Sequence, residues 1–298
     1  MENSVLRKVK VFAVLAVLGI VAFVGYKIYD SMKSVDFKIK VQDGLQISVD
    51  GINFKDEITK DDILGVGTSY EKAVNQVPKY LLNVSSAGGV TSGKLDIFNI
   101  DYTEGGEKMT AVKAEDVLCI DIEKCKNDRY IAIDVFLLAK EPTTLYLNKN
   151  SSVLSQVGNG KNGYYNAARV AFVVEGTVLE ENKNNAQMLS GGSSSILWEP
   201  NYDDNKKEEG ILQSYRAVDA EIKNSLSVGQ IEGNFNFSSV TPDVYTKVEE
   251  TEDKKLVAIP AGVTKLRIYM WVESLDVDMK ASAKTNRLFY NIDIGANK

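Results

Sequence analysis

The sequence predicts a mainly β protein, a jelly-roll-like antiparallel β-sandwich with long loops that is preceded by one N-terminal hydrophobic helix. Three observations lead to this fold class. Many short segments alternate apolar and polar residues, as half-buried strands do. Long polar connections separate these segments, and few stretches have helical periodicity. One long uncharged apolar run lies near the N-terminus. We therefore divide the 298 residues into an anchor with its flank at 1–34 and one β domain at 35–298.

The apolar run comprises residues 11–26, VFAVLAVLGIVAFVGY, and carries no charge. As a helix it spans about 24 Å, and continuing it to Tyr29 brings it near the ~30 Å thickness of a bilayer core. Basic residues precede it, as in an export signal, so we expect residues 11–29 to be an uncleaved signal-anchor with the domain outside the cell. Cleavage near Gly25 is the alternative, and it would give a secreted protein. Basic residues are nearly balanced across the run, so their count does not fix the orientation.

Strand patterns begin soon after this segment. FKIKVQ, residues 37–42, places Phe37, Ile39 and Val41 on one face. The next pattern, DGLQISVDG, is bracketed by Asp-Gly pairs, which are turn signals. Further alternating or apolar runs predict strands at residues 94–100, 129–139, 143–148, 168–176, 255–260, 263–272 and 287–295.

The remaining segments are expected to be short helices or loops. Residues 69–82 have room for a helical turn or two, interrupted by Pro78, whereas residues 215–225 suit either a short helix or a strand. No internal period of about 20–50 residues is visible, so a repeat array is excluded. Mixed charges and Gly/Ser runs predict solvated loops at residues 182–195, 203–210 and 249–255.

The composition excludes several classes of function. The chain contains no histidine, which removes Ser-His-Asp and Cys-His catalysis and HExxH zinc sites. With 35 basic and 41 acidic residues, the net charge is −6, and no long basic run stands outside the N-terminus. These charges argue against nucleic acid as a partner. Two cysteines, Cys119 and Cys125, are too few for a disulfide framework, so they are either unpaired thiols or one local bridge.

One acidic stretch is a candidate site. KLRIYMWVESLDVD, residues 265–278, begins as an alternating strand and ends with Glu273, Asp276 and Asp278 close together. Calcium prefers oxygen ligands such as carboxylates, so these three residues are a candidate metal site. Two other interpretations stay open: the polar end of a strand with its turn, or a carboxylate pair that hydrolyses a substrate. The stretch lacks the ligand order of an EF-hand loop. We assign no catalytic residue and no cofactor other than calcium.

Several segments, taken in order, are similar to a known group of proteins. DGLQISVDG stands early, YIAIDVFLL and LYLN lie mid-chain, and ARVAFV, LWEPN and IYMWVESLDVD follow. Together they resemble exported surface proteins of Gram-positive bacteria that are distantly similar to the TasA/camelysin type of biofilm-matrix proteins. The resemblance covers most of residues 37–295. It implies a jelly-roll sandwich, a role as a surface or fibre subunit, and assembly by an N-terminal strand donated to the next subunit. In that type the signal peptide is removed and frees the strand, so the poor cleavage site here is a departure.

These observations lead to three functional hypotheses. The first is a non-enzymatic structural surface protein, in which Phe37, Ile39 and Val41 form an assembly strand that fills a neighbour's groove. The open alternative for this strand is an ordinary first strand of its own sandwich. The second hypothesis is an adhesin, whose ligand is bound by the long loops around residues 182–210. The third and weakest is a calcium-dependent hydrolase that uses the acidic residues of the candidate metal site.

Overall fold

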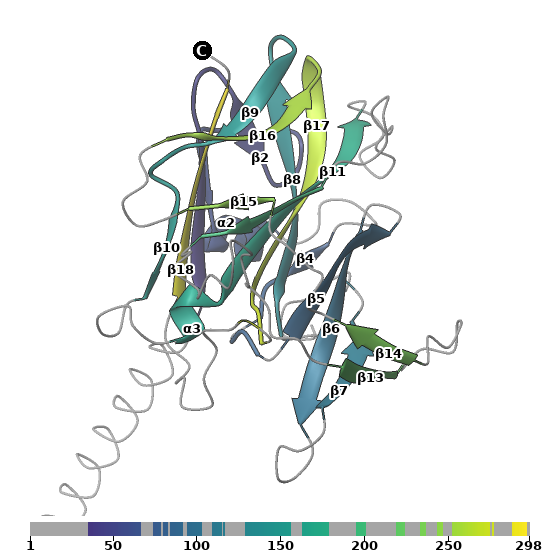
Figure 1. The fold of residues 1–298 in the computed structure, drawn as a ribbon. Coiled ribbons are helices and arrows are strands. Elements are labelled where there is room, and N and C mark those ends of the chain that lie inside the picture. Colours follow the sequence, from purple (N-terminus) through teal and green to yellow (C-terminus); the bar gives the residue numbers. More distant parts are fainter. Residues whose placement is uncertain are drawn as a thin grey trace, which may run out of the picture.

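The protein is mainly β in the part of the chain that the structure describes, and its strands form three sheets (Figure 1). Two short helices, α2 (Lys60–Val66) and α3 (Gly163–Asn166), accompany them. No described helix is long and apolar enough to cross a membrane. The predicted anchor at residues 11–29 and both cysteines lie outside the described residues. The computed structural model describes residues 35–66, 74–78, 80–82, 84–91, 94–102, 109–114, 116, 129–155, 163–178, 195–200, 219–223, 233–236, 243–246, 252–274, 276 and 288–296.

Sheet A has the strand order β16-β9-β18-β1-β3, and β10 pairs with β18 on the same side as β9. The pairing is antiparallel, except that β1 runs parallel to β18. The strands of sheet A are β1 (Asp36–Val41), β3 (Glu57–Thr59), β9 (Thr143–Leu147), β10 (Ser152–Ser155), β16 (Lys254–Ile259) and β18 (Leu288–Ala296).

Sheet B has the order β15-β12-β11-β17-β8-β2, with β4 also paired to β8. Its long central strands β8, β11 and β17 pair antiparallel, and one irregularity lies between Val174 and Gly176. The strands of sheet B are β2 (Gln46–Ser48), β4 (Asn75–Gln76), β8 (Ile131–Ala139), β11 (Ala168–Val178), β12 (Ser195–Glu199), β15 (Val244–Tyr245) and β17 (Gly262–Val272).

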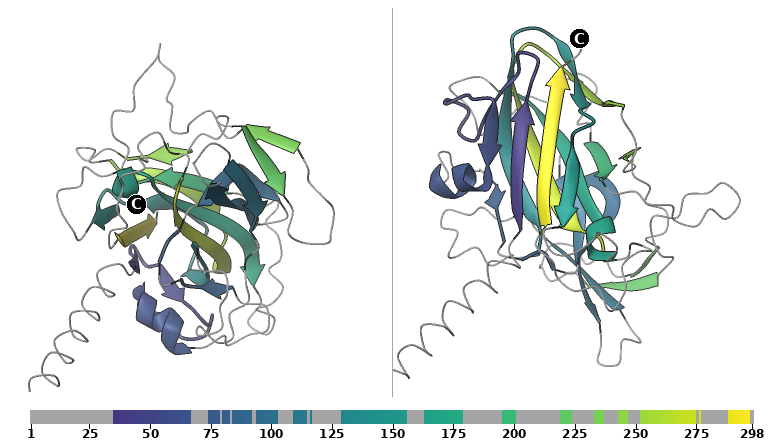
Figure 2. Two further views of the ribbon diagram at one scale, coloured as in Figure 1. Left: turned by 90° about the horizontal axis from the view of Figure 1, so that it is seen from below. Right: turned by 90° about the vertical axis from the view of Figure 1, so that its left-hand side faces the viewer.

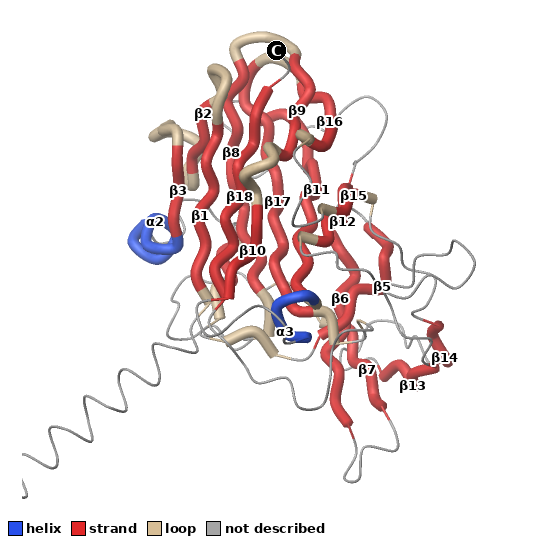
Figure 3. The backbone as a smooth tube through the Cα atoms, turned by 60° about the vertical axis from the view of Figure 1, so that its left-hand side comes forward, coloured by secondary structure: helices blue, strands red, loops and turns tan. Residues whose placement is uncertain are grey.

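Sheets A and B pack face to face over the main hydrophobic core (Figures 2 and 3). Every second residue of their strands points into it, because side chains alternate between the two faces of a sheet. The predicted inner face of the first strand is confirmed, and the last two predicted strands alternate in the same way. The inward residues of these strands are Phe37, Ile39 and Val41 of β1, Leu266, Ile268, Met270 and Val272 of β17, and Leu288, Tyr290, Ile292 and Ile294 of β18.

Sheet C forms a third layer, with the order β14-β13-β7-β6-β5. It packs against the outer face of sheet B through a second apolar cluster that includes Ile97, Tyr269 and Trp271. Both faces of the central strands of sheet B are therefore buried, which the alternation alone does not predict. The strands of sheet C are β5 (Val84–Thr91), β6 (Lys94–Tyr102), β7 (Met109–Lys113), β13 (Asp219–Lys223) and β14 (Gly233–Asn236).

The Asp-Gly pairs around β2 form the predicted turns. Asp43 and Gly44 have φ values of 59° and 84°, which suits an Asp-Gly turn because both types tolerate this region. In the second turn, one Asp50 carboxylate oxygen accepts the N–H groups of Ile52 and Asn53, each at 2.8 Å. Burial acts to raise the pKa of Asp50, but these hydrogen bonds hold it well below its usual value.

The mainly β fold with antiparallel sheets is thus confirmed, and the two packed sheets are consistent with a sandwich. The jelly-roll connectivity and the N-terminal helix stay predictions. A helical turn in residues 69–82 is wrong for the described part, where Asn75 and Gln76 form β4 because they pair with the edge of β8. Residues 215–225 contain the strand β13. Strand β16 begins at Lys254, inside a segment predicted to be loop, because its first two residues pair with β9.

Candidate functional site

The outer face of sheet B carries charged residues from three neighbouring strands. Asp134 lies in β8, Glu175 in β11, and Lys265 and Arg267 in β17. Arg267 is directly opposite Asp134 in the register of β17 and β8, so strand pairing alone brings an anion and a cation together. With Asp116, these residues form what we call the ionic cluster.

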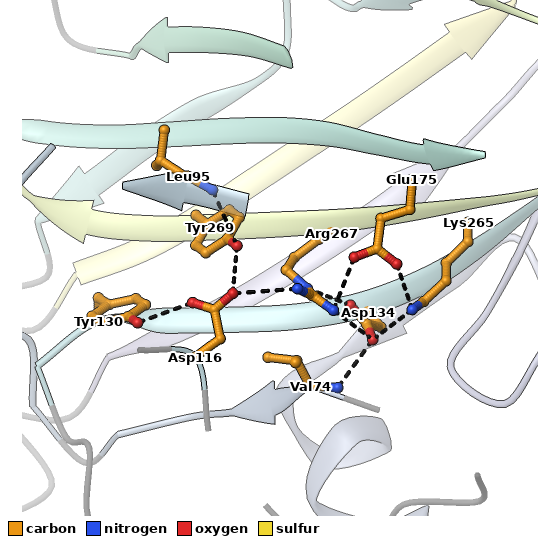
Figure 4. Close-up of polar contacts among 9 residues, drawn as sticks. All are labelled: Val74, Leu95, Asp116, Tyr130, Asp134, Glu175, Lys265, Arg267 and Tyr269. Atoms are coloured by element: carbon orange, nitrogen blue, oxygen red, sulfur yellow. Dashed lines mark hydrogen bonds and ion pairs between the residues drawn. The ribbon is translucent and has the colours of Figure 1, made fainter. Parts of the chain in front are cut away.

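The ionic cluster is held by a closed set of contacts (Figure 4). Arg267 Nε donates to Asp134 Oδ1 at 2.8 Å, and its two terminal nitrogens lie 2.9 Å from Glu175 Oε1 and 3.3 Å from Asp116 Oδ2. Lys265 Nζ lies 3.1 Å from Asp134 Oδ2 and 2.5 Å from Glu175 Oε2. The backbone N–H of Val74 also donates to Asp134, at 3.0 Å. These contacts tie the segment before β4 and residue 116 to the face of sheet B.

Two tyrosines extend the cluster toward sheet C. The hydroxyls of Tyr269 and Tyr130 donate to the two oxygens of Asp116, at 2.6 and 3.0 Å, and their rings stack with centroids 6.3 Å apart. Burial is the largest cause, and the negative charge of Asp116 the second, that raises the pKa of both tyrosines well above the usual tyrosine pKa. They therefore act as fixed hydrogen-bond donors at neutral pH.

The electrostatics of the cluster favour the charged forms of Asp134 and Arg267. Burial acts to raise the pKa of Asp134, but the charges of Arg267 and Lys265 outweigh burial and hold this pKa below its usual value. Burial acts to lower the pKa of Arg267, and the charges of Asp134 and Glu175 raise it instead. Such a cluster stabilises the packing only while all of its members are present, because each removed partner leaves a buried charge unpaired.

A second buried cluster contains one of the predicted metal ligands, Asp276. Asp276 is fully buried, and its carboxylate binds the guanidinium of Arg169. The same guanidinium nitrogen lies 3.0 Å from Oε1 of Glu199. Arg169 also donates from its other terminal nitrogen to the carbonyl of Ala168 at 2.9 Å. Asp276 of the candidate metal site is therefore paired with a cation from β11, which also binds a carboxylate from β12.

Glu273 has a different environment, at the junction between β17 and sheet C. It is fully buried, and its Oε2 accepts the N–H of Ser86 at 2.9 Å and the indole N–H of Trp271 at 3.2 Å. Next to it, the N–H of Ser274 donates to the carbonyl of Val84 at 2.9 Å. These bonds attach β5 to the end of β17. Burial raises the pKa of Glu273, although its hydrogen bonds and Arg169 act to lower it.

The calcium prediction concerned Glu273, Asp276 and Asp278. The first two are close in the structure and have protein partners, whereas Asp278 lies outside the described residues. Within the residues that the structure describes, no three or more carboxylate or cysteine side chains are grouped so that they could hold a metal ion. The contacts of Glu273 and Asp276 favour the interpretation as polar groups at a strand end, and the calcium site stays a prediction.

The predicted assembly strand is β1, and it occupies the interior of sheet A. It lies between β18 and β3, with Phe37, Ile39 and Val41 buried in the main core. This position favours the alternative that β1 is a strand of its own domain. The loops predicted for the adhesin hypothesis, residues 182–194 and 203–210, lie outside the described residues.

Sequence reasoning missed the partners of the acidic residues, above all Arg169, Glu199 and the members of the ionic cluster. A signal was present in two strands. RYIAIDVFLLA carries a single acid, Asp134, among apolar residues, and ARVAFVV carries a single base, Arg169. A lone charge within a strand that is otherwise apolar indicates a buried and paired group, because an unpaired buried charge is costly.

Comparison with known proteins adds no relative, since no family model, no curated protein and no solved structure matches the chain. The resemblance to exported surface proteins of Gram-positive bacteria stays a prediction. The functional argument therefore depends on the geometry of the chain itself.

Replacing Glu273 with Gln is expected to change how stability depends on pH. Because the pKa of Glu273 is raised in the folded state, the native protein binds more protons than the unfolded chain as the pH rises above the usual pKa of 4.5. Wild-type stability is therefore lost in this window, up to the folded pKa, and Glu273→Gln avoids this loss. Urea unfolding of both proteins between about pH 4.5 and 7.5 measures the difference.

The free energy of unfolding of Glu273→Gln should increase relative to that of wild type as the pH rises. The charged neighbours Arg169, Asp276 and Glu199 are present in both proteins, so their contributions to stability cancel to first order in the difference. A constant difference across the pH range would mean that Glu273 does not titrate in this window.

Proposed function

We propose that the chain is a non-enzymatic structural protein of the cell surface, held to the membrane by residues 11–29 with its β domain outside. One observation carries this proposal: β1 begins at Asp36, so only residues 30–35 separate the apolar run from the interior of a sheet. Six residues reach at most about 20 Å. The anchor and the packed domain are then directly coupled.

The contacts of the charged residues support a framework role. Asp134, Glu273 and Asp276 are fully buried and each binds groups from other strands. They join the segment before β4 and the strands β8, β11 and β17 of the middle layer, and they attach β5 of sheet C to it. Carboxylates used in this way hold layers together, and that is a structural rather than a chemical use.

We also propose that the two large sheets are connected as a jelly roll. Strand β8 leads into β9, and β16 leads into β17, through short turns that pass from one sheet to the other. The strands joined by these two turns are neighbours in both sheets, since β17 pairs with β8 and β16 pairs with β9. They form one double-stranded ribbon that folds over the core, which is the kind of unit from which jelly rolls are built.

Self-assembly through β1 is part of the same proposal. A neighbour would have to insert its own residues 36–41 between β18 and β3 after the resident strand has left. The buried side chains Phe37, Ile39 and Val41 supply the pattern for that insertion, because alternate side chains fill pockets while the backbone completes the sheet. An anchored N-terminus restricts this exchange to neighbours in the same membrane.

Cysteine labelling in intact native cells tests the location of the domain. In a chain with Cys119 and Cys125 replaced by Ser, Ile52→Cys places a thiol at a residue that is 67% exposed. A membrane-impermeant maleimide should label it without permeabilisation. The matched variant Ser4→Cys, on the other side of the apolar run, should react only after permeabilisation.

Fractionation and N-terminal sequencing complete the test. The anchored form predicts an intact Met1 end in the membrane fraction. A mature end near residue 26 in the medium would replace the anchor with a secreted form. Labelling of Ile52→Cys only after permeabilisation would reject the surface location altogether.

A further inference from the structure

Strands β1 and β18 lie side by side and run in the same direction (Figure 2, right). Six residue pairs are in register, from Asp36 opposite Phe289 to Val41 opposite Ile294. In a parallel pair, the start of one strand lies at the opposite end from the finish of the other. The chain therefore enters β1 at one end of the pair and leaves β18 at the other end.

This arrangement decides how the pair responds to tension. A pull on the chain before Asp36 and after Ala296 slides β1 lengthwise along β18. The hydrogen bonds of a parallel pair are evenly spaced, so such sliding loads all of them together. A pull across the strands would instead load the bonds at one end first and open the pair one residue at a time.

The buried side chains oppose the same sliding. Phe37, Ile39 and Val41 point into the core beside alternate residues of β18. A shift of one residue turns every side chain of a strand to the opposite face of the sheet. Sliding therefore exposes the whole apolar row of β1 at its first step, or requires a jump of two residues at once.

Polar bonds lock the far end of the pair. Gln42 follows β1, and its side-chain nitrogen lies 2.6 Å from both carboxylate oxygens of Asp293 in β18. Its backbone N–H donates to the carbonyl of Ile294 at 2.9 Å. Asp293 also accepts a bond from the Asn148 side chain at 3.0 Å, and a Cβ at Gly295 would lie 2.7 Å from Oδ1 of the same asparagine. A larger residue at position 295 would therefore displace the Asn148 side chain.

The other edge of β1 is held as well. Val41 donates its N–H to the carbonyl of Asp56 at 2.8 Å, and β3 pairs antiparallel with the middle of β1. Before the strand, the carbonyl of Val35 accepts a bond from Lys60 Nζ at 2.7 Å. Tension at the start of β1 thus meets bonds on both of its sides.

We propose that β1 and β18 form a mechanical clamp, which makes the domain resist tension that enters before Asp36 and leaves after Ala296. The source of that tension rests on the proposed function, because a membrane anchor before β1 would pull on this point. The clamp goes beyond anchoring: it makes the domain a load-bearing link whose strength depends on the direction of pulling.

Single-molecule force spectroscopy on the full chain in detergent tests the clamp. One handle is fused before Met1 and the other after Lys298, which loads the pair lengthwise. For the crosswise direction, the second handle is attached at Leu154→Cys, with Cys119 and Cys125 replaced by Ser. Leu154 is 49% exposed and pairs with Phe289, which is opposite Asp36, so these three residues lie on one line across sheet A.

The lengthwise unfolding force is expected to be at least about twofold higher than the crosswise force at the same loading rate, because forced unfolding follows the barrier along the pulled direction. Gln42→Ala removes the side-chain lock and should lower the lengthwise force while leaving the crosswise force unchanged. Equal forces in the two directions would overturn the clamp. So would a Gln42→Ala variant that weakens both directions alike.

The two proposals can fail separately. If the domain is labelled only inside the cell but the forces differ with direction, the clamp stands and its load does not come from a surface anchor. If the domain is outside and the forces are equal, the surface location stands and the clamp is wrong.

Discussion

Replacing Asp134 with Asn is expected to lower the free energy of unfolding by about 3–5 kcal/mol, which is the range for breaking one buried ion pair. The carboxylate accepts from Arg267 Nε, Lys265 Nζ and the N–H of Val74. Asn keeps the shape but has one oxygen, so its amide nitrogen must face one of these donors. Two cations then remain buried with fewer negative partners.

Urea unfolding at neutral pH measures the loss. Glu175→Gln is the matched control, because Glu175 contacts the same two cations but its side chain is 14% exposed. Water can replace part of its contacts, so we expect a smaller loss. An Asp134→Asn protein as stable as the control would show that the buried pair contributes little to folding.

The pH dependence of Asp134 has the opposite sign to that of Glu273. The pKa of Asp134 is lowered in the folded state. The carboxylate therefore contributes its full stability above the unfolded pKa of 3.8, and this stability is lost as the pH falls through the folded pKa. The difference in the free energy of unfolding between wild type and Asp134→Asn should therefore become smaller below about pH 3.8. A gap that widens in acid would mean that the carboxylate is not held in its charged form.

The strands were predictable because their period is local. FKIKVQ and KLRIYMWV alternate, and their apolar faces pack on the core of sheets A and B as expected. The third layer was not predictable, because the outward residues of β17 mix Lys265 and Arg267 with Tyr269 and Trp271. A sheet face of this composition could either be exposed to solvent or pack against another sheet. Only the packing of sheet C decides between them.

The candidate site was predictable only in part, for a related reason. Glu273 and Asp276 stand close together in the sequence, so their proximity could be predicted. The partner of Asp276 comes from a distant strand, since Arg169 lies 107 residues before it. The same holds in the ionic cluster, where Asp134 is 133 residues before Arg267. Strand order sets these pairs, and one sequence does not reveal strand order.

Replacing Arg169 with Met is expected to lower the free energy of unfolding by about 3–5 kcal/mol as well. The guanidinium binds Asp276 and Glu199, and all three side chains are almost fully buried. Met fills much of the same volume, so the loss measures the two carboxylates left without their cation rather than a cavity. The same urea measurement, with tryptophan fluorescence as its signal, follows the unfolding of a domain that buries Trp198 and Trp271.

A double-mutant cycle shows whether unpaired charge causes this loss. In the Arg169→Met background, Asp276→Asn removes one of the two unpaired carboxylates. It should restore about 1–3 kcal/mol of the free energy of unfolding, within the range of coupling between neighbouring residues. In the wild-type background the same substitution should destabilise, because Arg169 loses a partner. This reversal of sign is specific to a buried pair. Additive losses would mean that the two residues act separately. The effect of Arg169→Met would then come from lost packing of the guanidinium and not from unpaired charge.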